Sequence, residues 1–122
     1  VRALLEESLA IARQAGIESG RIVLDPGIGF FRRAAMPWER WDCEVVRNLR
    51  ELTDLGYPLL VGISRKSFIG KILGRSDPAD RLPGSLAATV VAVLNGAALI
   101  RTHDVAATRD AVRMAEALRG AN

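Results

Sequence analysis

Three short polar clusters, each placed directly after an apolar run, hold the side chains of this sequence that could do chemistry. The clusters are Asp25-Pro26-Gly27-Ile28-Gly29-Phe30, Ser64-Arg65-Lys66-Ser67 and Arg101-Thr102-His103-Asp104, which follow the apolar runs Ile22–Leu24, Leu59–Ile63 and Ala97–Ile100. In parallel α/β proteins, ligands bind at the carboxyl ends of the strands. The clusters are therefore predicted to be parts of one site, whose cations and hydroxyl groups suit an anionic, hydrogen-bonding ligand.

The first cluster combines a carboxylate with a backbone that turns easily. Asp25 precedes a proline, which has no N–H, and the glycines Gly27 and Gly29, which allow a ligand to approach the backbone closely. The carboxylate can accept two hydrogen bonds from the N–C–NH₂ edge of a heterocycle, although capping of its own turn explains the segment as well. The glycines do not form a dinucleotide-binding fingerprint, because Arg32 stands where the third glycine is needed.

The second and third clusters offer cations and hydroxyl groups. For Ser64-Arg65-Lys66-Ser67, a solvated charged turn is the plainer alternative to a binding site. Alternation along a strand sends Arg101 and His103 to the same side, where they suit phosphate oxygens, although a lone histidine is more often structural. Asp104 is predicted to cap the next helix, whose first N–H groups also favour anions. Gly70-Lys71 lacks the Ser or Thr that completes a nucleotide-triphosphate loop.

Nucleophilic and metal chemistry have little support in the sequence. With one histidine no Ser-His-Asp order can be argued, and no group of residues has the spacing of metal ligands. Cys43 lies in an expected amphipathic helix without a histidine nearby, which favours a packing or surface role. Trp38 and Trp41 are expected to pack along the same helix.

Composition limits the class of protein. The chain has 122 residues, of which 49% are hydrophobic, as expected for one globular domain over residues 1–122. No apolar run is long enough to span a membrane, and a single cysteine gives no disulfide framework, so a cytoplasmic location is expected. Seventeen basic side chains face fourteen acidic ones along the whole chain and aromatic residues make up 5%, which argues against nucleic-acid binding.

The spacing of apolar residues predicts helices that alternate with strands. A helix over residues 1–15 precedes three strand–loop–helix units with strands at 22–24, 59–63 and 97–100. The other expected helices are one that carries Trp41 to Leu55 and is closed by Gly56, a short turn within 64–74, one from an N-cap at Ser85 to Asn95-Gly96, and one from Asp104 through Leu118. Because three buried parallel strands leave two open edges, we expect an α/β fold that is the C-terminal arc, the last three β/α units, of a TIM (β/α)₈ barrel.

Four motifs, which together cover nearly the whole chain, resemble the C-terminal part of the dihydropteroate synthase family. They are Leu24–Phe30, Val61–Gly70, Arg81–Ala87 and Arg101–Val105. The resemblance implies a pterin-binding (β/α)₈ barrel that joins 6-hydroxymethyl-7,8-dihydropterin diphosphate to 4-aminobenzoate, giving 7,8-dihydropteroate and pyrophosphate in folate biosynthesis. Because only the last three strands are matched and the chain opens at Val1 on a helical pattern, we expect a fragment that is active only within a complete barrel.

The resemblance also implies roles for individual residues. Asp25 and Lys66 would bind the pterin, Arg101, Thr102 and His103 the diphosphate, and Phe30, Lys66 and Ser67 the 4-aminobenzoate, at the site that sulfonamides occupy. No protein nucleophile is needed, because an aryl amine attacks a methylene carbon as a stabilised anion departs. Family members use Mg²⁺ on the diphosphate, but the ligand for it comes from the first strand, which lies outside this chain. A homodimer is implied for the complete protein.

The chain departs from the family after Phe30. Family members commonly continue with Gly or Ala and then Lys, whereas this chain has Phe31-Arg32-Arg33 and then Met36-Pro37-Trp38-Glu39. Arg32 can take over the charge of the lysine. Two other hypotheses are a pterin-binding barrel such as a methyltetrahydrofolate methyltransferase and a non-catalytic divergent barrel kept as a binding or assembly module. The second and third clusters disfavour the methyltransferase, because methyl transfer releases no diphosphate.

Overall fold

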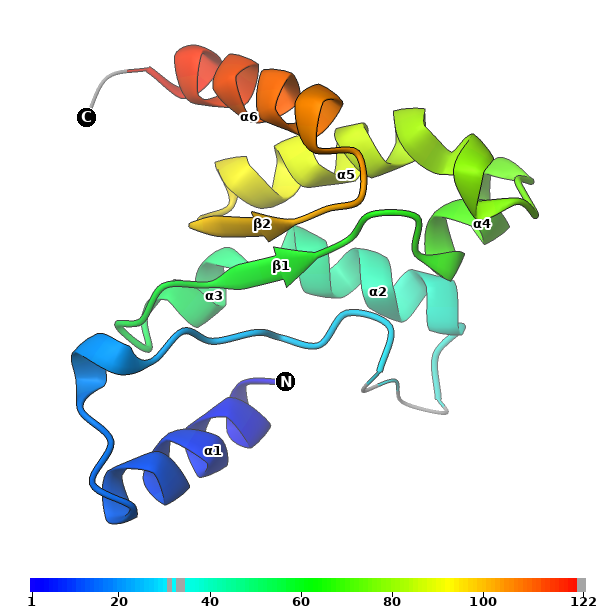
Figure 1. The fold of residues 1–122 in the computed structure, drawn as a ribbon. Coiled ribbons are helices and arrows are strands. Elements are labelled where there is room, and N and C mark those ends of the chain that lie inside the picture. The colour runs from blue at the N-terminus through cyan, green and yellow to red at the C-terminus, as the bar shows by residue number, and fades with distance from the viewer. Residues whose placement is uncertain (31, 33–34, 121–122) are drawn as a thin grey trace.

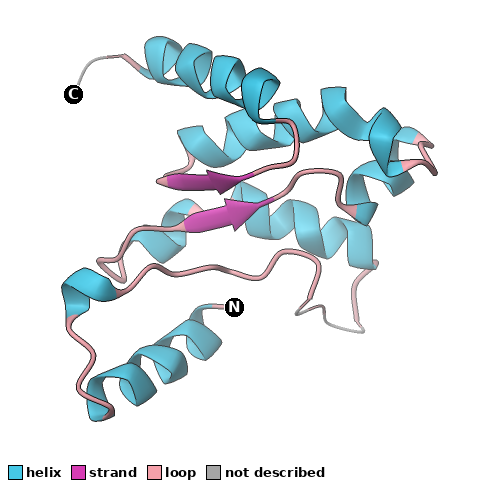
Figure 2. Cartoon of the chain, viewed as in Figure 1, coloured by secondary structure: helices cyan, strands magenta, loops and turns pink. Residues whose placement is uncertain are grey.

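The computed structural model describes residues 1–30, 32 and 35–120, and shows helices that alternate with short strands (Figure 1). The elements in chain order are α1 (Arg2–Gln14), the 3₁₀ turn η1 (Ser19–Arg21), α2 (Trp38–Arg47), α3 (Arg50–Thr53), β1 (Leu60–Gly62), α4 (Ser67–Leu73), the 3₁₀ turn η2 (Pro78–Arg81), α5 (Leu82–Leu94), β2 (Leu99–Arg101) and α6 (Val105–Arg119). In the view of Figure 2, α2 and α3 lie behind β1, α5 lies above β2, and α6 packs on α5.

The strands β1 and β2 are parallel, as the alternation of strands and helices predicts. Their register pairs Leu60 with Leu99, Val61 with Ile100 and Gly62 with Arg101. A parallel pair needs a crossover connection, and here α4, η2 and α5 provide it. β1 is one residue shorter than predicted at each end, whereas β2 begins two positions later than expected and continues one position beyond the expected end, through Arg101. Arg101 is therefore part of the ladder, with its backbone fixed by β1.

The first predicted strand, residues 22–24, is an extended segment with a single bridge. Leu24 bridges to Leu59 in the parallel sense, donating its N–H to the Pro58 carbonyl over 2.9 Å and accepting the Leu60 N–H over 2.8 Å. Pro26 follows almost at once and has no N–H with which to extend the ladder. The three predicted strand positions thus lie side by side with β1 in the middle, although the ladder on one side is short (Figure 1).

Alternate residues of β1, the central strand, point to opposite faces of the sheet. Leu59, Val61 and Ile63 are each at most 1% exposed and belong to the core formed with the helices. Because side chains alternate along a strand, Gly62 and its neighbours at even positions point to the opposite face. On β2, Arg101 lies opposite Gly62 and is exposed. Arg101 therefore lies on the face of the sheet turned away from the helices.

One predicted helix is broken in two. The helix expected to run to Leu55 ends at Arg47 and resumes at Arg50, as α2 and α3. Between them, the side-chain amide of Asn48 donates to the Glu44 carbonyl over 3.0 Å. Asparagine competes locally for backbone hydrogen bonds, which disfavours a continuous helix at this position.

The predicted N-cap at Ser85 is wrong. Helix α5 begins earlier, at Leu82, with Pro83 in its first turn. Proline is preorganised for the first turn of a helix, so no serine is needed to begin it. Ser85 lies inside α5, is 3% exposed, and accepts the backbone N–H of Arg65 over 2.9 Å. Its hydroxyl therefore stabilises the loop after β1 instead of the start of α5.

Close packing of α4 on α5 depends on Gly84. A Cβ atom at this position would lie 2.4 Å from Cγ2 of Ile69 and 2.8 Å from Cδ1 of Leu73. Ile69 is 4% exposed, so its side chain has little room to move. Since α4 begins directly after the second polar cluster, this contact also helps to place that cluster.

We expect Gly84→Ala to lower the free energy of unfolding by about 1–3 kcal/mol, because the added methyl group overpacks the contact between α4 and α5. The better helix propensity of alanine offsets up to about 1 kcal/mol of this loss. Urea unfolding followed by circular dichroism measures the difference. Gly20→Ala is the matched control, because a Cβ atom at Gly20 would have nothing within 4 Å. Equal stability of the two variants would contradict the packing described here.

Candidate functional site

An ion pair joins the end of β2 to the first polar cluster. Nη1 and Nη2 of Arg101 each lie 3.4 Å from Oδ2 of Asp25. Oδ1 of Asp25 accepts the Gly27 N–H over 2.8 Å, so the turn-capping role that the sequence allows is present as well. The side chains of Arg101 and Asp25 are 60% and 39% exposed, and an exposed pair contributes at most about 1 kcal/mol. A ligand can therefore separate these two groups at little cost.

Gly62 makes room for this ion pair. It lies on β1 opposite Arg101, and a Cβ atom there would be 2.5 Å from Nη2 of Arg101. A side chain at this position would displace the guanidinium, which lies across the strand. The missing side chain thus allows Arg101 to reach from β2 over β1 to Asp25.

Lys66 joins the same group from the loop after β1. Its Nζ donates to the Ile28 carbonyl over 2.8 Å and lies 4.7 Å from the centre of the Phe30 ring. Burial lowers the pKa of the Lys66 amine below its ordinary value of 10.5, and the positive charge of Arg101 acts in the same direction. The structure therefore brings the predicted residues Asp25, Lys66 and Arg101 together at one edge of the sheet.

Phe30 and Ser67, predicted for the same site, lie on the exposed side of Lys66. Phe30 is 74% exposed, and Ser67 is the exposed first residue of α4. Oγ of Ser67 lies 3.4 Å from Nη2 of Arg32. The departure from the family at Phe31 and Arg33 falls outside the described residues.

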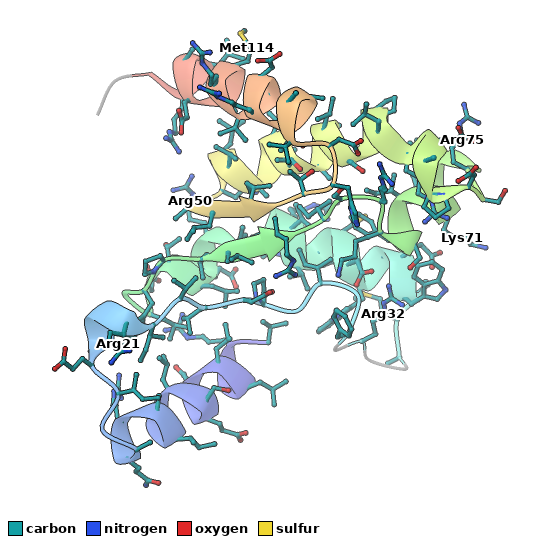
Figure 3. The ribbon with its side chains drawn as sticks, in the orientation of Figure 1. Arg21, Arg32, Arg50, Lys71, Arg75 and Met114 are labelled. Carbon is teal, nitrogen blue, oxygen red and sulfur yellow. The ribbon has the colours of Figure 1, made fainter. Side chains whose placement is uncertain are left out.

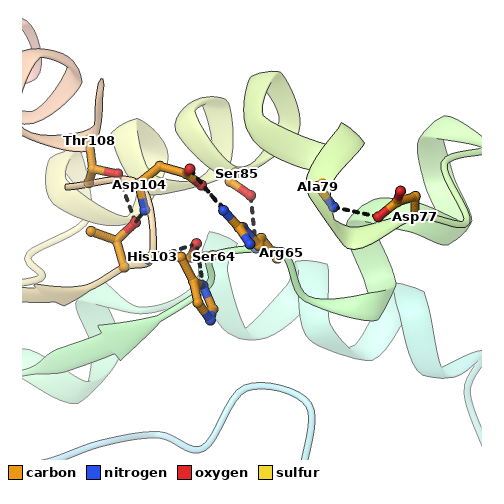
Figure 4. A network of polar contacts seen from close by, with 9 residues as sticks. Ser64, Arg65, Asp77, Ala79, Ser85, His103, Asp104 and Thr108 are labelled. Atoms are coloured by element: carbon orange, nitrogen blue, oxygen red, sulfur yellow. Dashed lines mark hydrogen bonds and ion pairs between the residues drawn. The ribbon is translucent and has the colours of Figure 1, made fainter. Parts of the chain in front are cut away.

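His103 faces the end of β1. Its backbone N–H donates to Oγ of Ser64 over 3.2 Å, and its Nδ1 lies 2.9 Å from the same oxygen (Figure 4). Gly62 pairs with Arg101, and two residues further along each segment Ser64 contacts His103. Arg101 and His103 therefore share a face of the sheet, as alternation predicts. When the hydroxyl donates to Nδ1, the neutral imidazole carries its proton on Nε2. Nε2 is then a hydrogen-bond donor.

Arg65 holds the loop between Ser64 and Lys66 in an uncommon conformation. Its φ is 60°, in the left-handed region that few residues other than glycine adopt. Nε and Nη2 of Arg65 contact the two carboxylate oxygens of Asp104 at 3.3 and 3.0 Å (Figure 4). Its carbonyl accepts a hydrogen bond from Nη1 of Arg81 over 2.9 Å. Together with the bond to Ser85, these contacts fix the loop that presents Lys66.

The predicted side-chain cap at Asp104 is wrong, although the residue does occupy the N-cap position of α6. Its carboxylate makes no cap hydrogen bond, because it pairs with Arg65, which also lowers the pKa of Asp104. The Thr102 side chain makes the hydrogen bonds at the start of α6 instead. Its Oγ1 accepts the Asp104 N–H over 3.3 Å and lies 2.8 Å from Oγ1 of Thr108. The Thr102 hydroxyl is therefore engaged with the start of α6, not with Arg101 or His103.

Asp42 is a residue of this region that sequence reasoning missed. It lies in α2 and is 0% exposed, yet it accepts hydrogen bonds from the Gly29 N–H at 3.3 Å and from Nε and Nη2 of Arg32 at 3.3 and 2.6 Å. The available signal was its position between Trp38 and Val46 on the inward stripe of the helix. A carboxylate on such a stripe requires a partner, because an unpaired buried charge is costly.

The described part of the chain offers no residues for nucleophilic or metal chemistry. Cys43 packs partly buried against the core, as predicted, and burial raises the pKa of its thiol, which keeps it in the weakly nucleophilic protonated form. Within residues 1–30, 32 and 35–120, no group of three His, Cys, Asp or Glu side chains is placed to hold a metal ion. Over the same residues, no helix has the length and apolar character that a membrane span requires.

The chain is similar to known dihydropteroate synthases over most of its length. It is 42% identical over 118 residues to that of Synechocystis, an alignment that covers 97% of this chain and 39% of the relative. It is 47% identical over 105 residues to that of Neisseria meningitidis serogroup C, covering 85% of this chain and 35% of the relative. The chain thus spans between about a third and two fifths of the length of these curated relatives.

Solved structures agree with this similarity. The dihydropteroate synthase of Xanthomonas albilineans in complex with 7,8-dihydropteroate superposes with a TM-score of 0.90 at 38% identity, over 99% of this chain and 46% of that one. The Yersinia pestis enzyme superposes with a TM-score of 0.87 at 37% identity, over 96% of this chain and 52% of that one. The predicted fold, an arc of a (β/α)₈ barrel, is confirmed.

A protein-family model also matches most of the chain. The model for pterin binding enzymes matches residues 1–103, a span that includes each of the three strand-end clusters up to His103. The match covers more than half of the chain and agrees with the fold of the similar solved structures. The chain therefore belongs to the family of pterin-binding enzymes.

Proposed function

We propose that this chain supplies part of the active site of a dihydropteroate synthase. The enzyme would join 6-hydroxymethyl-7,8-dihydropterin diphosphate to 4-aminobenzoate and release pyrophosphate. The observation that carries the proposal is the convergence of Asp25, Lys66 and Arg101 from three neighbouring strand ends on one face of the sheet. Similar solved structures are named for complexes with 7,8-dihydropteroate and with 4-aminobenzoic acid.

We assign the pterin ring to Asp25 and Lys66. Two carboxylate oxygens can accept the two N–H groups along the N–C–NH₂ edge of a pterin. The hydrogen bond from Gly27 holds the Asp25 side chain in one orientation, so little rotational freedom is lost when the ring binds. The Lys66 amine, anchored on the Ile28 carbonyl, adds a donor from the other side.

We assign the diphosphate to Arg101 and His103. The planar guanidinium offers paired donors to phosphate oxygens, and Nε2 of His103 adds one more. Negative charge on the diphosphate grows as its C–O bond breaks, so donors that are in place beforehand favour the transition state. Arg101 must leave Asp25 to take this role, which their weak exposed pairing allows. Direct contact of Thr102 with the diphosphate stays a prediction.

We assign 4-aminobenzoate to the strip formed by Phe30, the Lys66 stem and Ser67. The exposed Phe30 ring offers an apolar face to the aryl ring of the substrate. The amine nitrogen attacks the methylene carbon of the pterin, so that the new C–N bond forms as the C–O bond to the diphosphate breaks and the amine gives up a proton. Binding both reactants on adjacent groups of one rigid sheet edge supplies the required proximity.

A Mg²⁺ ion on the diphosphate, a homodimer, a cytoplasmic location and the lack of nucleic-acid binding are further predictions for the complete protein. The described residues do not fit a Mg²⁺ site, because this ion prefers several oxygen ligands, whereas the cluster holds cations and a carboxylate paired with Arg101. No step above depends on the metal.

Arg101→Ala is expected to lower kcat/KM for the pterin diphosphate by about 100-fold, because removal of a preorganised donor to developing negative charge has a cost of this order. The assay measures dihydropteroate formation by the complete protein that contains this chain. Lys66→Ala should also reduce the rate, and Arg113→Ala on the exposed surface of α6 is the control. A folded wild-type protein that forms no product would contradict the proposed function. Full activity in both the Arg101 and the Lys66 variant would contradict the assigned site.

The lowered pKa of Lys66 predicts an alkaline limb in the rate profile. As pH rises through a value below 10.5, the free enzyme loses the Lys66 charge, and kcat/KM for the pterin diphosphate should fall. Arginine keeps its charge over this range, so Lys66→Arg should shift the limb to higher pH. The measurement is kcat/KM from about pH 7 to pH 11 for both proteins. Superimposable alkaline limbs would show that another group titrates.

A further inference from the structure

Arg32 is the most firmly oriented cation beside the proposed aminobenzoate strip. The carboxylate of Asp42 accepts hydrogen bonds from Nε and Nη2 of Arg32, over 3.3 and 2.6 Å. The guanidinium carbon lies 4.6 Å from the centre of the Trp38 ring, which holds the guanidinium plane by a cation–π contact. Figure 3 shows Arg32 between the loop after Asp25 and the start of α2. Its position is thus fixed from two sides before any ligand binds.

Asp42 is built to hold this arginine. It is 0% exposed, so its charge would be costly without a partner, and the bidentate contact with Arg32 supplies one. The same carboxylate accepts the Gly29 N–H over 3.3 Å, which ties the arginine to the loop that carries Phe30. A change in either residue would therefore alter the geometry of the other.

The partly exposed Arg32 side chain borders the same space as Lys66. A methyl group placed on Gly29 would lie 3.6 Å from Nη2 of Arg32 and 3.7 Å from Nζ of Lys66. Nη2 also lies 3.4 Å from Oγ of Ser67, whose side chain is exposed. Arg32, Lys66 and Ser67 therefore surround one region next to the Phe30 ring.

Arg32 retains donors for a ligand. A guanidinium has five N–H groups, and those of Nε and Nη2 are directed at Asp42 and Ser67. Over residues 1–30, 32 and 35–120, nothing accepts a hydrogen bond from Nη1. Because the charge of Asp42 neutralises that of Arg32, the pair presents oriented hydrogen-bond donors without a net positive charge. Nη1 can therefore donate to one oxygen of a carboxylate, and the Ser67 hydroxyl, which lies beside Nη2, can donate to the other.

We propose that Arg32, positioned by Asp42, recognises the carboxylate of the arylamine substrate, with Ser67 as a second donor. The inference rests on the proposed function, and it assigns the specificity for an anionic arylamine to two residues. The carboxylate is remote from the reacting amine, so its contacts are equally strong before and during the reaction. Loss of these contacts should raise KM for the arylamine and leave kcat nearly unchanged.

The sharpest test is the double variant Arg32→Gln, Asp42→Asn in the complete protein that contains this chain. It removes one positive and one negative charge together, so the local net charge is kept and no buried carboxylate is left without a partner. We expect KM for 4-aminobenzoate to rise roughly tenfold or more, because charge-assisted hydrogen bonds are lost, while KM for the pterin diphosphate stays within about twofold. Inhibition by 4-aminobenzamide, the uncharged analogue, should be the same in both proteins.

Two further variants keep the test decisive. Arg32→Lys retains a cation on Asp42 but loses the planar fork, so its KM for 4-aminobenzoate should fall between those of the wild type and the double variant. Arg40→Gln, exposed on the same helix, is the matched control. Thermal unfolding identifies any variant that has lost its fold. An unchanged KM for 4-aminobenzoate, or an equal rise in both KM values, overturns this inference alone, whereas a wild type that forms no product overturns the proposed function beneath it.

Discussion

The parallel pairing of β1 with a neighbour on each side is the interaction on which the site depends. It sets Asp25, the glycine at the end of β1, and Arg101 side by side, because the carboxyl ends of parallel strands meet at one edge. Side chains alternate with a period of two, so a slip of one residue would turn Arg101 and His103 toward the helices. Buried residues at alternate positions of β1, such as Val61, resist this slip because they would have to leave the core. The chemistry at the strand ends is thus fixed by packing on the opposite face.

The loop after β1 shows how the fold maintains a strained segment. A left-handed conformation at a residue with a side chain has a cost of roughly 1–2 kcal/mol, and Arg65 adopts it between Ser64 and Lys66. Hydrogen bonds from three separate elements offset this cost: Ser85 of α5, Arg81 of η2 and Asp104 before α6 each bind Arg65. The same contacts link the loop that carries Lys66 to the segment that carries His103, so two parts of the site are positioned together.

The sequence indicated the strand ends and their convergence at one edge of the sheet, because an apolar run that breaks into polar residues is a local pattern. It did not indicate the partners of individual side chains, which only the tertiary fold decides. Ser85 matched an N-cap by local rules but is needed as a buried acceptor for Arg65. Asp104 takes the same arginine as a partner instead of capping its helix. Asp42 was missed because nothing in its neighbourhood in the sequence points to Arg32, the residue it binds.

We propose that the three strand ends bind different parts of one pair of substrates. Asp25 and Arg101 contact each other here, whereas the proposed roles require them to part and bind a pterin ring and a diphosphate. A crystal structure of the complete protein with the pterin diphosphate and a non-reactive arylamine tests this directly. We expect the pterin on Asp25 and Lys66, the diphosphate on Arg101 and His103, and the arylamine between Phe30 and Ser67. An intact pair of Asp25 with Arg101 and ligands bound elsewhere would contradict the account.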